Sequence, residues 1–371
     1  MLAISVVFII LYGGLFYYYL RGWNLARVES EKKIAANRMI SVIIPARNEE
    51  KNILRLLDAL KEQSYPPAFF EIIVVDDFST DDTAGVVNSS GLQNLRCIQP
   101  AVGTEQSSKK KAIEAGIANA EGELIVTTDA DCIPAREWLQ TIHQFYIETS
   151  AEFIAAPVKF THDKSLLQTF QAIDFLTLQG ITAASVTSGS LSMCNGANLA
   201  YTKKAFNEVN GFEGIDHVAT GDDMLLMHKI WKKHPSNVHY LKNKNAIVRT
   251  EPMATWKEFF MQRKRWASKT LVYDDRRIIA VLVFVYLFNC LFFLLVAFAI
   301  VNPLYWWYVV GFWIAKALVE FPFVKRVAGF YGEEKLLTSF FFLQPLHIFY
   351  TVFVGLLSQF GKYEWKGRRT K

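Results

Sequence analysis

Residues 41–50 read Ser-Val-Ile-Ile-Pro-Ala-Arg-Asn-Glu-Glu, an apolar run that stops abruptly in a polar turn. The β-branched part, Ser41–Pro45, predicts a buried strand, and the spacing of apolar residues in Glu50–Gln63 predicts the helix that follows. The same alternation continues downstream, with strands expected at Glu71–Asp76 and Glu123–Thr128 and a helix over Lys109–Ala120 between them. Strands that alternate with helices predict an α/β domain with a mostly parallel central sheet, covered on both faces.

Each predicted strand ends in polar side chains. The three endings read Pro45-Ala46-Arg47-Asn48-Glu49, Asp76-Asp77 and Asp129-Ala130-Asp131. Open α/β sheets bind their ligands beyond the carboxyl ends of the strands. We therefore expect these acidic side chains and the arginine to share one crevice.

Asp129 and Asp131 stand two residues apart, directly after the apolar strand Leu124–Thr128. Such a pair can hold a hard divalent cation together with diphosphate oxygens, a mixed ligation that Mg²⁺ and Mn²⁺ favour. An Asx turn is the alternative, since aspartate is common in turns. The buried strand before the pair and the other acidic strand ends favour the metal site.

The hydrophobic residues, 51% of this 371-residue chain, are concentrated at its two ends. Residues 2–20 carry no charge and have the length of a membrane-spanning helix. Basic residues follow at Arg21, Arg27, Lys32 and Lys33. A cleaved signal peptide is the alternative, but the basic segment that should precede its apolar run is missing. We expect a retained anchor over residues 1–20, with its amino terminus outside the cell.

Three further apolar stretches, Ile278–Val301, Leu304–Phe323 and Thr338–Phe360, predict a membrane region over residues 278–360 with two to three spans. Residues 325–335 and the tail, 361–371, are both basic. One simple span between two basic flanks contradicts the preference of basic residues for the cytoplasm. We therefore expect the last stretch to be broken at Pro345 with the tail inside; a tail outside is the alternative.

Charge and cysteine content bear on the partners and the compartment of this protein. The net charge of +5 is modest and no long basic run interrupts the middle of the chain, so nucleic acid is not an expected partner. The basic residues lie beside apolar segments, which suits a membrane lipid surface. The four cysteines form no CxxC pair, which indicates reduced thiols in a cytosolic domain.

Five motifs occur in a characteristic order. They are Ser41–Glu50, Val74-Val-Asp-Asp77, Asp129-Ala-Asp131, Thr220-Gly-Asp-Asp223 and Gln262-Arg-Lys-Arg-Trp266. Together they closely resemble glycosyltransferase family 2, whose catalytic domain has the GT-A fold. The resemblance covers about residues 39–270.

The resemblance implies a donor site. Its nucleoside pocket would be lined by Pro45, Ala46, Arg47 and Glu49. Asp77, with Asp76 behind it, would accept a hydrogen bond from the base. Lys109 would lie near the donor, although Ser108 stands where the family has a glycine. Asp131 would be the direct metal ligand, with Asp129 facing the ribose or donor sugar beside the metal.

The resemblance also implies a catalytic base in the segment 220–223. A carboxylate at the start of the predicted helix could take the acceptor proton during an inverting transfer. Asp222 is the expected base and Asp223 the second choice, while helix capping is the structural alternative. The segment Asn195–Tyr201 resembles the family's acceptor border, so Asn195, Gly196 and Asn198 are candidate acceptor contacts.

Thr255–Leu271 predicts an amphipathic helix in the membrane interface. Its apolar face would carry Trp256, Phe259, Phe260, Trp266, Ala267 and Leu271. In relatives, the spacing Q-x-x-R-W closes the acceptor end of the site against the donor diphosphate. The resemblance therefore implies that Gln262 and Arg265 contact the donor and that Trp266 contacts both donor and acceptor.

These observations predict an inverting glycosyltransferase of the cell (inner) membrane with a cytoplasmic catalytic domain. The expected donor is a nucleotide-sugar, with UDP as the default, and the expected acceptor is a lipid-linked, polyprenyl-linked or other saccharide. A processive polysaccharide synthase is the alternative. A dehydrogenase would need a glycine-rich turn after the first strand, which is absent. The expected parts are an anchor (1–20), a GT-A domain (38–253), an interfacial helix (254–277), the membrane region (278–360) and a tail (361–371).

Overall fold

The computed structural model describes residues 2–27, 34–100, 108–191, 193–216, 218, 221–268, 275–358, 363–365 and 368–370. The chain divides into two compact units. The α/β unit comprises Ala26–Thr161 and Leu191–Glu251. The helical unit comprises Met1–Leu25, His162–Ser190 and Pro252–Lys371. Thr220, Leu271 and much of the basic tail lie outside the described residues.

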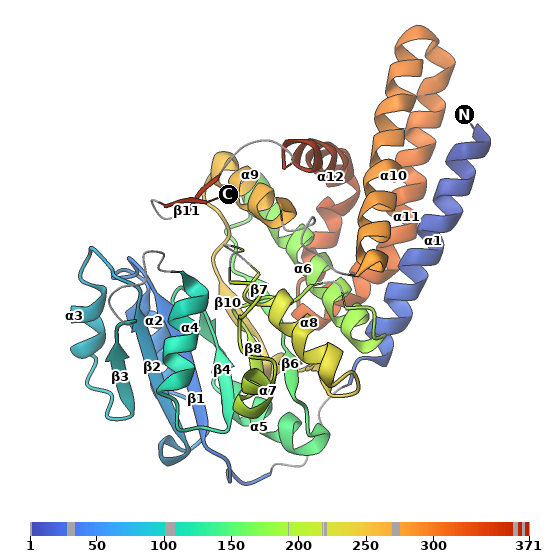
Figure 1. Ribbon diagram of the computed structural model, residues 1–371. Helices are drawn as coiled ribbons and strands as arrows, with labels where there is room; N and C mark the ends of the chain where they lie inside the picture. Colours follow the sequence, from blue (N-terminus) through green and yellow to red (C-terminus); the bar gives the residue numbers. More distant parts are fainter. Residues whose placement is uncertain are drawn as a thin grey trace. The chain divides into compact units, whose positions relative to one another are not determined.

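The α/β unit is built on a seven-stranded sheet in the order β3-β2-β1-β4-β8-β6-β9 (Figure 1). Its strands are β1 (Ile40–Ala46), β2 (Phe70–Asp76), β3 (Leu95–Ile98), β4 (Leu124–Thr127), β6 (Phe153–Ala155), β8 (Leu199–Thr202) and β9 (Val238–Tyr240). In this sheet β8 runs antiparallel to its neighbours β4 and β6, and the other pairings are parallel. The predicted mostly parallel sheet is therefore confirmed.

The register of the sheet decides where the polar strand ends meet. Ala46 pairs with Asp76 on β2, and Ile43 pairs with Thr127 on β4. Every residue of β2 and β4 is buried, as the unbroken apolar runs predict. Because β2, β1 and β4 are adjacent and parallel, their carboxyl ends lie along one edge of the sheet.

Helices and a small second sheet complete the α/β unit. The helices are α2 (Ile53–Lys61), α3 (Thr83–Asn88), α4 (Lys109–Ala118), α5 (Trp138–Thr149), α7 (Lys203–Glu208) and α8 (Met224–Lys233), with short 3₁₀ turns η1 (Pro67–Phe69) and η2 (Lys244–Ala246). The second sheet has the order β5 (Ile133–Pro134), β10 (Val248–Thr250) and β7 (Val158–Phe160). It begins just after Asp131.

Two local contacts hold the parallel strands and their helix together. A Cβ on Gly116 of α4 would lie 2.5 Å from Ile43 Cγ2, so glycine allows α4 to sit directly on β1. Glu71 of β2 accepts hydrogen bonds from Ser41 Oγ at 2.6 Å and from Glu121 N at 2.6 Å, and it is paired with Arg96 of β3. Burial would raise the pKa of Glu71, but these hydrogen bonds and Arg96 bring it below its ordinary value.

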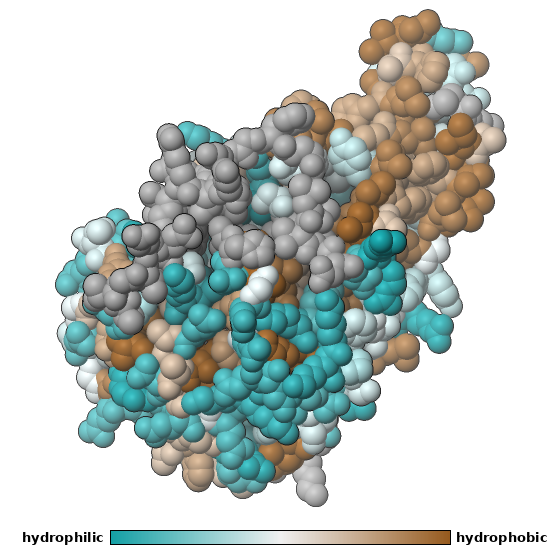
Figure 2. Space-filling model, in the orientation of Figure 1, coloured by the Kyte–Doolittle hydropathy of each residue, from teal (hydrophilic) through white to brown (hydrophobic). Residues whose placement is uncertain are grey.

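The helical unit contains the long helices. They are α1 (Leu2–Leu25), α6 (Leu166–Thr187), α9 (Trp256–Ala267), α10 (Arg276–Val301), α11 (Trp306–Tyr331) and α12 (Leu337–Leu357), with 3₁₀ turns η4 (Pro303–Tyr305) and η5 (Glu334–Leu336) and a hairpin of β11 (Tyr363–Trp365) and β12 (Arg368–Thr370). Among the described residues, four helices are long and apolar enough to cross a membrane: α1, α10, α11 and α12. Figure 2 shows a hydrophobic surface over α1, α10 and α11. Ile10 on α1, Leu287 on α10 and Trp307 on α11 are at least half exposed.

The amino-terminal helix is longer than the sequence predicts. The first helix continues past residue 20 to Leu25. Its last turns pack inside the helical unit: a Cβ on Gly22 would lie 2.7 Å from the carbonyl oxygen of Ala184, and the Trp23 ring meets Phe330 at 5.4 Å. Tertiary packing therefore extends the helix beyond the apolar run.

The expected break at Pro345 is wrong, because α12 continues through this proline from Leu337 to Leu357. A proline inside a helix removes one hydrogen bond and favours a kink, but neighbouring helices can hold the two arms together. The second apolar stretch is also longer than expected, since α11 continues to Tyr331 through residues expected to form a basic loop.

Residues 162–190 belong to the helical unit, whereas the sequence reading placed them inside one continuous α/β domain. They form α6, whose residues are buried over most of its length. The close approach of α6 to α11 depends on Gly180, where a Cβ would meet Val327 Cγ2 at 2.5 Å and Phe323 Cζ at 2.8 Å. A helix buried on nearly all sides lacks the amphipathic pattern that would have marked it in the sequence.

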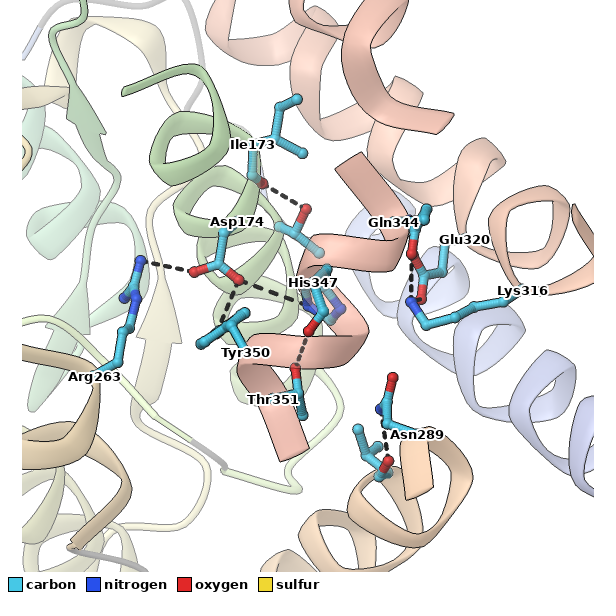
Figure 3. A network of polar contacts seen from close by, with 12 residues as sticks. Ile173, Asp174, Arg263, Asn289, Lys316, Glu320, Gln344, His347, Tyr350 and Thr351 are labelled. Atoms are coloured by element: carbon cyan, nitrogen blue, oxygen red, sulfur yellow. Dashed lines mark hydrogen bonds and ion pairs between the residues drawn. The ribbon is translucent and has the colours of Figure 1, made fainter. Parts of the chain in front are cut away.

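A polar cluster lies buried among α1, α11 and α12 (Figure 3). Lys316 Nζ lies 2.5 Å from Glu320 Oε1 and 2.6 Å from Gln344 Oε1. Gln344 Nε2 donates to Glu320 Oε2 at 2.6 Å, and the Tyr12 hydroxyl donates to Glu320 Oε1 at 2.5 Å. The two charges within the apolar helix α11 thus neutralise each other inside the helical unit.

Candidate active site

The ends of β1 and β2 are joined by direct hydrogen bonds. Asp77 N donates to the carbonyl oxygen of Ala46 at 2.8 Å, and Arg47 Nη1 donates to the carbonyl oxygen of Asp77 at 2.7 Å. Pro45 is paired with Val75 at the same end of the sheet. The structure therefore brings together the residues predicted to line the nucleoside pocket.

Two carboxylates at this edge support the loops. Asp76 is 2% exposed and accepts from Ser79 N at 3.1 Å and from Gln99 Nε2 at 2.9 Å. Glu49 is 8% exposed and accepts from Asn52 Nδ2 at 2.9 Å. Asp76 thus uses both oxygens within the fold, which suits a supporting position behind Asp77.

The next strand end carries a cluster of charges. Lys109 Nζ lies 2.6 Å from Asp129 Oδ1 and 3.1 Å from Asp222 Oδ2, so one ammonium group bridges two carboxylates. Lys109 is the first residue of α4, and the Ser108 side chain caps this helix by accepting from Lys111 N. Burial alone would lower the pKa of Lys109, but the charges of Asp129 and Asp222 raise it well above its ordinary value. Lys109 is therefore a fixed positive charge.

Asp222 and Asp223 have different surroundings. Asp223 Oδ1 accepts from Met224 N at 2.7 Å, and Oδ2 accepts from Gly196 N at 3.3 Å, so its two oxygens hold the start of α8. Asp222 directs Oδ2 to Lys109, and its side chain is 13% exposed. Backbone amides therefore engage both oxygens of Asp223, whereas Asp222 faces the ammonium group of Lys109.

The Asp129–Asp131 pair can be tested against the chemistry of a divalent cation. The Asp129 side chain is 37% exposed, and Asp131 is exposed. Within the described ranges, no three Asp, Glu, His or Cys side chains gather as a complete ligand set. Mg²⁺ commonly takes one or two carboxylates and fills its other positions with phosphate oxygens and water. The pair therefore fits a cation that binds together with a diphosphate.

In the segment Asn195–Tyr201, which was expected to contact the acceptor, Gly196 lies beside the charged residues and Asn195 forms a turn. Gly196 adjoins the charge cluster, since a Cβ there would lie 3.0 Å from Lys109 Nζ and 3.2 Å from Asp222 Oδ2. Asn195 is half-buried and its Oδ1 accepts from Ala197 N at 3.0 Å, which makes the turn.

Asn198 is not an acceptor contact, which corrects the expectation. It is fully buried; its Oδ1 accepts from Trp138 Nε1 at 2.9 Å, and its Nδ2 donates to the carbonyl oxygens of Pro157 and Ala246, both at 2.8 Å. An amide with these three partners inside the core holds α5, β7 and η2 together. Sequence alone could not separate this role from ligand binding, since an asparagine can serve either purpose and its core partners are distant in the chain.

Gln262, Arg265 and Trp266 lie on α9, which belongs to the helical unit. A capping box of Thr255 and Glu258 starts the helix. Its two buried residues are Phe259 and Arg263. The sequence analysis missed Arg263; the available signal was a third basic residue inside the motif, three positions before Trp266.

Comparisons with known proteins agree with this geometry. Residues 41–209 match the family model for glycosyl transferase family 2. The chain is 27% identical over 203 residues to glycosyltransferase AglE of Haloferax volcanii, covering 54% of this chain and 62% of that protein. It is 33% identical over 111 residues to undecaprenyl-phosphate 4-deoxy-4-formamido-L-arabinose transferase of Serratia proteamaculans, covering 29% of this chain and 31% of that protein.

A solved structure resembles nearly the whole chain. It is mannosyltransferase PcManGT from Pyrobaculum calidifontis in complex with GDP-Man and Mn²⁺, with a TM-score of 0.58 and 18% identity over 96% of this chain and 98% of that one. At this identity the likeness shows the fold alone. The chain spans less than two thirds of either curated relative. The predicted GT-A fold with transmembrane helices at both ends is confirmed, and so is the resemblance to the family.

Proposed function

We propose that the chain, whose residues 41–209 match the family model for glycosyl transferase family 2, is an inverting glycosyltransferase that uses a nucleotide-sugar donor, with UDP-sugars as the first class to test. The observation that carries the proposal is the position of Asp222. It lies beside Lys109 and Gly196 at the carboxyl edge of the sheet, next to the end of β4 that carries Asp129.

Asp222 is proposed as the general base. Its carboxylate takes the proton of the acceptor hydroxyl while that oxygen forms a bond to the anomeric carbon of the donor sugar. The bond between that carbon and the diphosphate oxygen breaks, the nucleoside diphosphate leaves, and the configuration at the carbon inverts. Lys109 orients Asp222 through the ion pair at 3.1 Å.

The diphosphate side of the site is proposed to involve Asp131 and Asp129, which would hold Mg²⁺ or Mn²⁺. The bound cation would stabilise the negative charge of the leaving group. Arg47 and Asp77 would bind the nucleoside, since they meet at the ends of β1 and β2. Chelation by EDTA should abolish transfer, and added Mg²⁺ or Mn²⁺ should restore it; full transfer in EDTA would refute the metal role.

The acceptor is proposed to be lipid-linked or polyprenyl-linked. The four candidate spans would bring the catalytic unit to a membrane surface, and the Serratia relative is named for a transfer to undecaprenyl phosphate. We propose the cytoplasmic face of the cell membrane, because Arg21 and Arg27 follow the apolar part of α1. Three spans after the catalytic segments are few for a polysaccharide channel, so we favour a single addition over processive synthesis.

The Q-x-x-R-W residues of α9 are proposed to complete the acceptor side of the site. Arg265 would pair with phosphate through its planar guanidinium, and Trp266 would stack on a sugar. Arg265→Lys should therefore impair transfer, because a point charge cannot reproduce a two-pronged contact. Arg265→Ala and Trp266→Ala should leave the protein membrane-bound, because a lost indole weakens apolar contact by no more than about 1.5–3 kcal/mol and the spans remain.

The test is transfer of labelled sugar by the purified full-length chain in nanodiscs. UDP-glucose, UDP-N-acetylglucosamine and GDP-mannose are supplied in turn with undecaprenyl phosphate, and the lipid extract is analysed by mass spectrometry. Asp222→Asn should lose transfer, whereas Asp58→Asn, which changes an exposed carboxylate on α2, should retain it. One added sugar supports the proposal, a ladder of products supports processive synthesis, and no transfer from any donor refutes the proposed function.

A further inference from the structure

Arg263 lies inside the Q-x-x-R-W segment and has an unusual environment for a basic residue of an interfacial helix. Its side chain is 3% exposed, and Phe259, one turn earlier on α9, is fully buried. Lys257 and Met261 of the same helix are exposed. The face of α9 that packs inward therefore carries a charge, which burial disfavours unless the charge has a specific partner.

The partner is Asp174 of α6. Arg263 Nη2 lies 2.7 Å from Asp174 Oδ2, and the Asp174 side chain is also 3% exposed. Asp174 Oδ1 accepts from the Tyr350 hydroxyl at 3.1 Å and lies 3.7 Å from His347 Nε2, both on α12 (Figure 3). One carboxylate thus joins α6, α9 and α12, with the guanidinium at one of its oxygens and the tyrosine and histidine at the other.

The guanidinium is also placed against the motif tryptophan. Arg263 Cζ lies 4.2 Å from the centre of the Trp266 ring and 5.1 Å from that of Phe259. Trp266 also meets Phe175, the chain neighbour of Asp174 on α6, with ring centres 6.3 Å apart. The indole therefore contacts both the guanidinium and the residue that follows the guanidinium's acidic partner in the chain.

We propose that Arg263 is a positioning residue for Trp266, and that Asp174 and Tyr350 hold Arg263 in place. This inference rests on the proposed role of Trp266 in transfer. A flat guanidinium can stack on the indole while it pairs with a carboxylate at its edge, and an ammonium cannot make both contacts. The arrangement keeps the indole in one orientation before any sugar arrives, which lowers the entropy lost on binding.

The test compares transfer by the full-length chain in nanodiscs for Arg263→Lys, Trp266→Ala and the double variant. Lys264→Gln is the matched control, since it removes a positive charge from the adjacent position. We expect Arg263→Lys to lower turnover about 10- to 30-fold, the size of a lost cation–π contact in a dry site. Donor affinity and melting temperature should stay near those of the wild type, and the control should be unaffected.

The double variant decides the mechanism. If Arg263 acts through Trp266, Arg263→Lys added to Trp266→Ala causes no further loss of turnover. Multiplied losses would mean that Arg263 acts independently, and wild-type turnover in Arg263→Lys would equally overturn the inference. Normal transfer by Trp266→Ala alone would instead refute the proposed role of the motif.

Tyr350→Phe provides a second, milder variant in case Arg263→Lys disturbs folding. It removes one hydrogen bond to Asp174 and leaves the ion pair intact. We expect a smaller loss of turnover, which should vanish in the Trp266→Ala background. A loss of equal factor in both backgrounds would contradict the inference.

Discussion

Glu320 is the residue of the membrane region whose replacement should be most damaging. The Lys316 side chain is 0% exposed and that of Glu320 is 7% exposed. In Glu320→Leu, the ammonium of Lys316 loses its carboxylate and keeps its hydrogen bond to the amide oxygen of Gln344. Tyr12 and Gln344 also lose the carboxylate oxygens to which they donate. Because the buried charge has no counter-ion, we expect the free energy of unfolding to fall by about 3–5 kcal/mol.

A graded series separates the lost ion pair from simple loss of packing. Lys316→Met added to Glu320→Leu removes the uncompensated charge and leaves an unsatisfied amide at Gln344, which costs about 1–3 kcal/mol. Adding Gln344→Leu should recover most of this, since an apolar replacement of a whole buried network is often neutral. Tyr12→Phe alone removes one hydrogen bond and should cost only about 0.6 kcal/mol.

The assay is equilibrium unfolding of the purified full-length chain in mixed detergent micelles, followed by circular dichroism. The wild type should be the most stable, followed by the triple variant (Glu320→Leu, Lys316→Met, Gln344→Leu), then the double variant (Glu320→Leu, Lys316→Met), and the single variant Glu320→Leu should be the least stable. If Glu320→Leu costs less than about 1 kcal/mol, or if the triple variant is as unstable as the single one, the cluster does not balance a buried charge and the reasoning is wrong.

Three further outcomes concern the α/β unit. Asp222→Asn should lower turnover about 10²- to 10⁴-fold with donor affinity retained. Asp223→Asn should mainly lower the melting temperature, because it weakens the start of α8. The opposite pattern in transfer and melting assays would exchange the two roles. Asn198→Ala should lower the free energy of unfolding by about 1–3 kcal/mol without changing the acceptor KM, and a KM effect alone would restore its acceptor role. The pKa of Glu71 is lower in the folded protein than in the unfolded chain. Glu71 therefore contributes its full stability at pH values above its unfolded pKa, and this contribution is lost as the pH falls through its folded pKa. Glu71→Gln should remove this dependence, so the free energy of unfolding measured with urea should fall less steeply in acid.

The positions of the strands, the acidic strand ends and the apolar spans could be predicted because each depends on neighbours along the chain. Alternation of β-branched and polar residues is local, and so is the end of a strand at Ala46 or Thr127. Parallel pairing then places such ends at one edge of a sheet without further information. This is why Arg47, Asp77 and Asp129 could be named as site residues before the fold was known.

Tertiary structure decided which of the candidate side chains also hold the fold together. Asn198 and Asp223 are engaged by partners distant in sequence: Trp138 for the first and Gly196 for the second. Arg263 and Asp174 are 89 positions apart in the chain, so no local pattern could pair them. A hydrogen bond or ion pair between distant segments forms only when the elements that carry its two partners pack together. The partner of a buried polar side chain therefore cannot be read from its neighbours in the sequence.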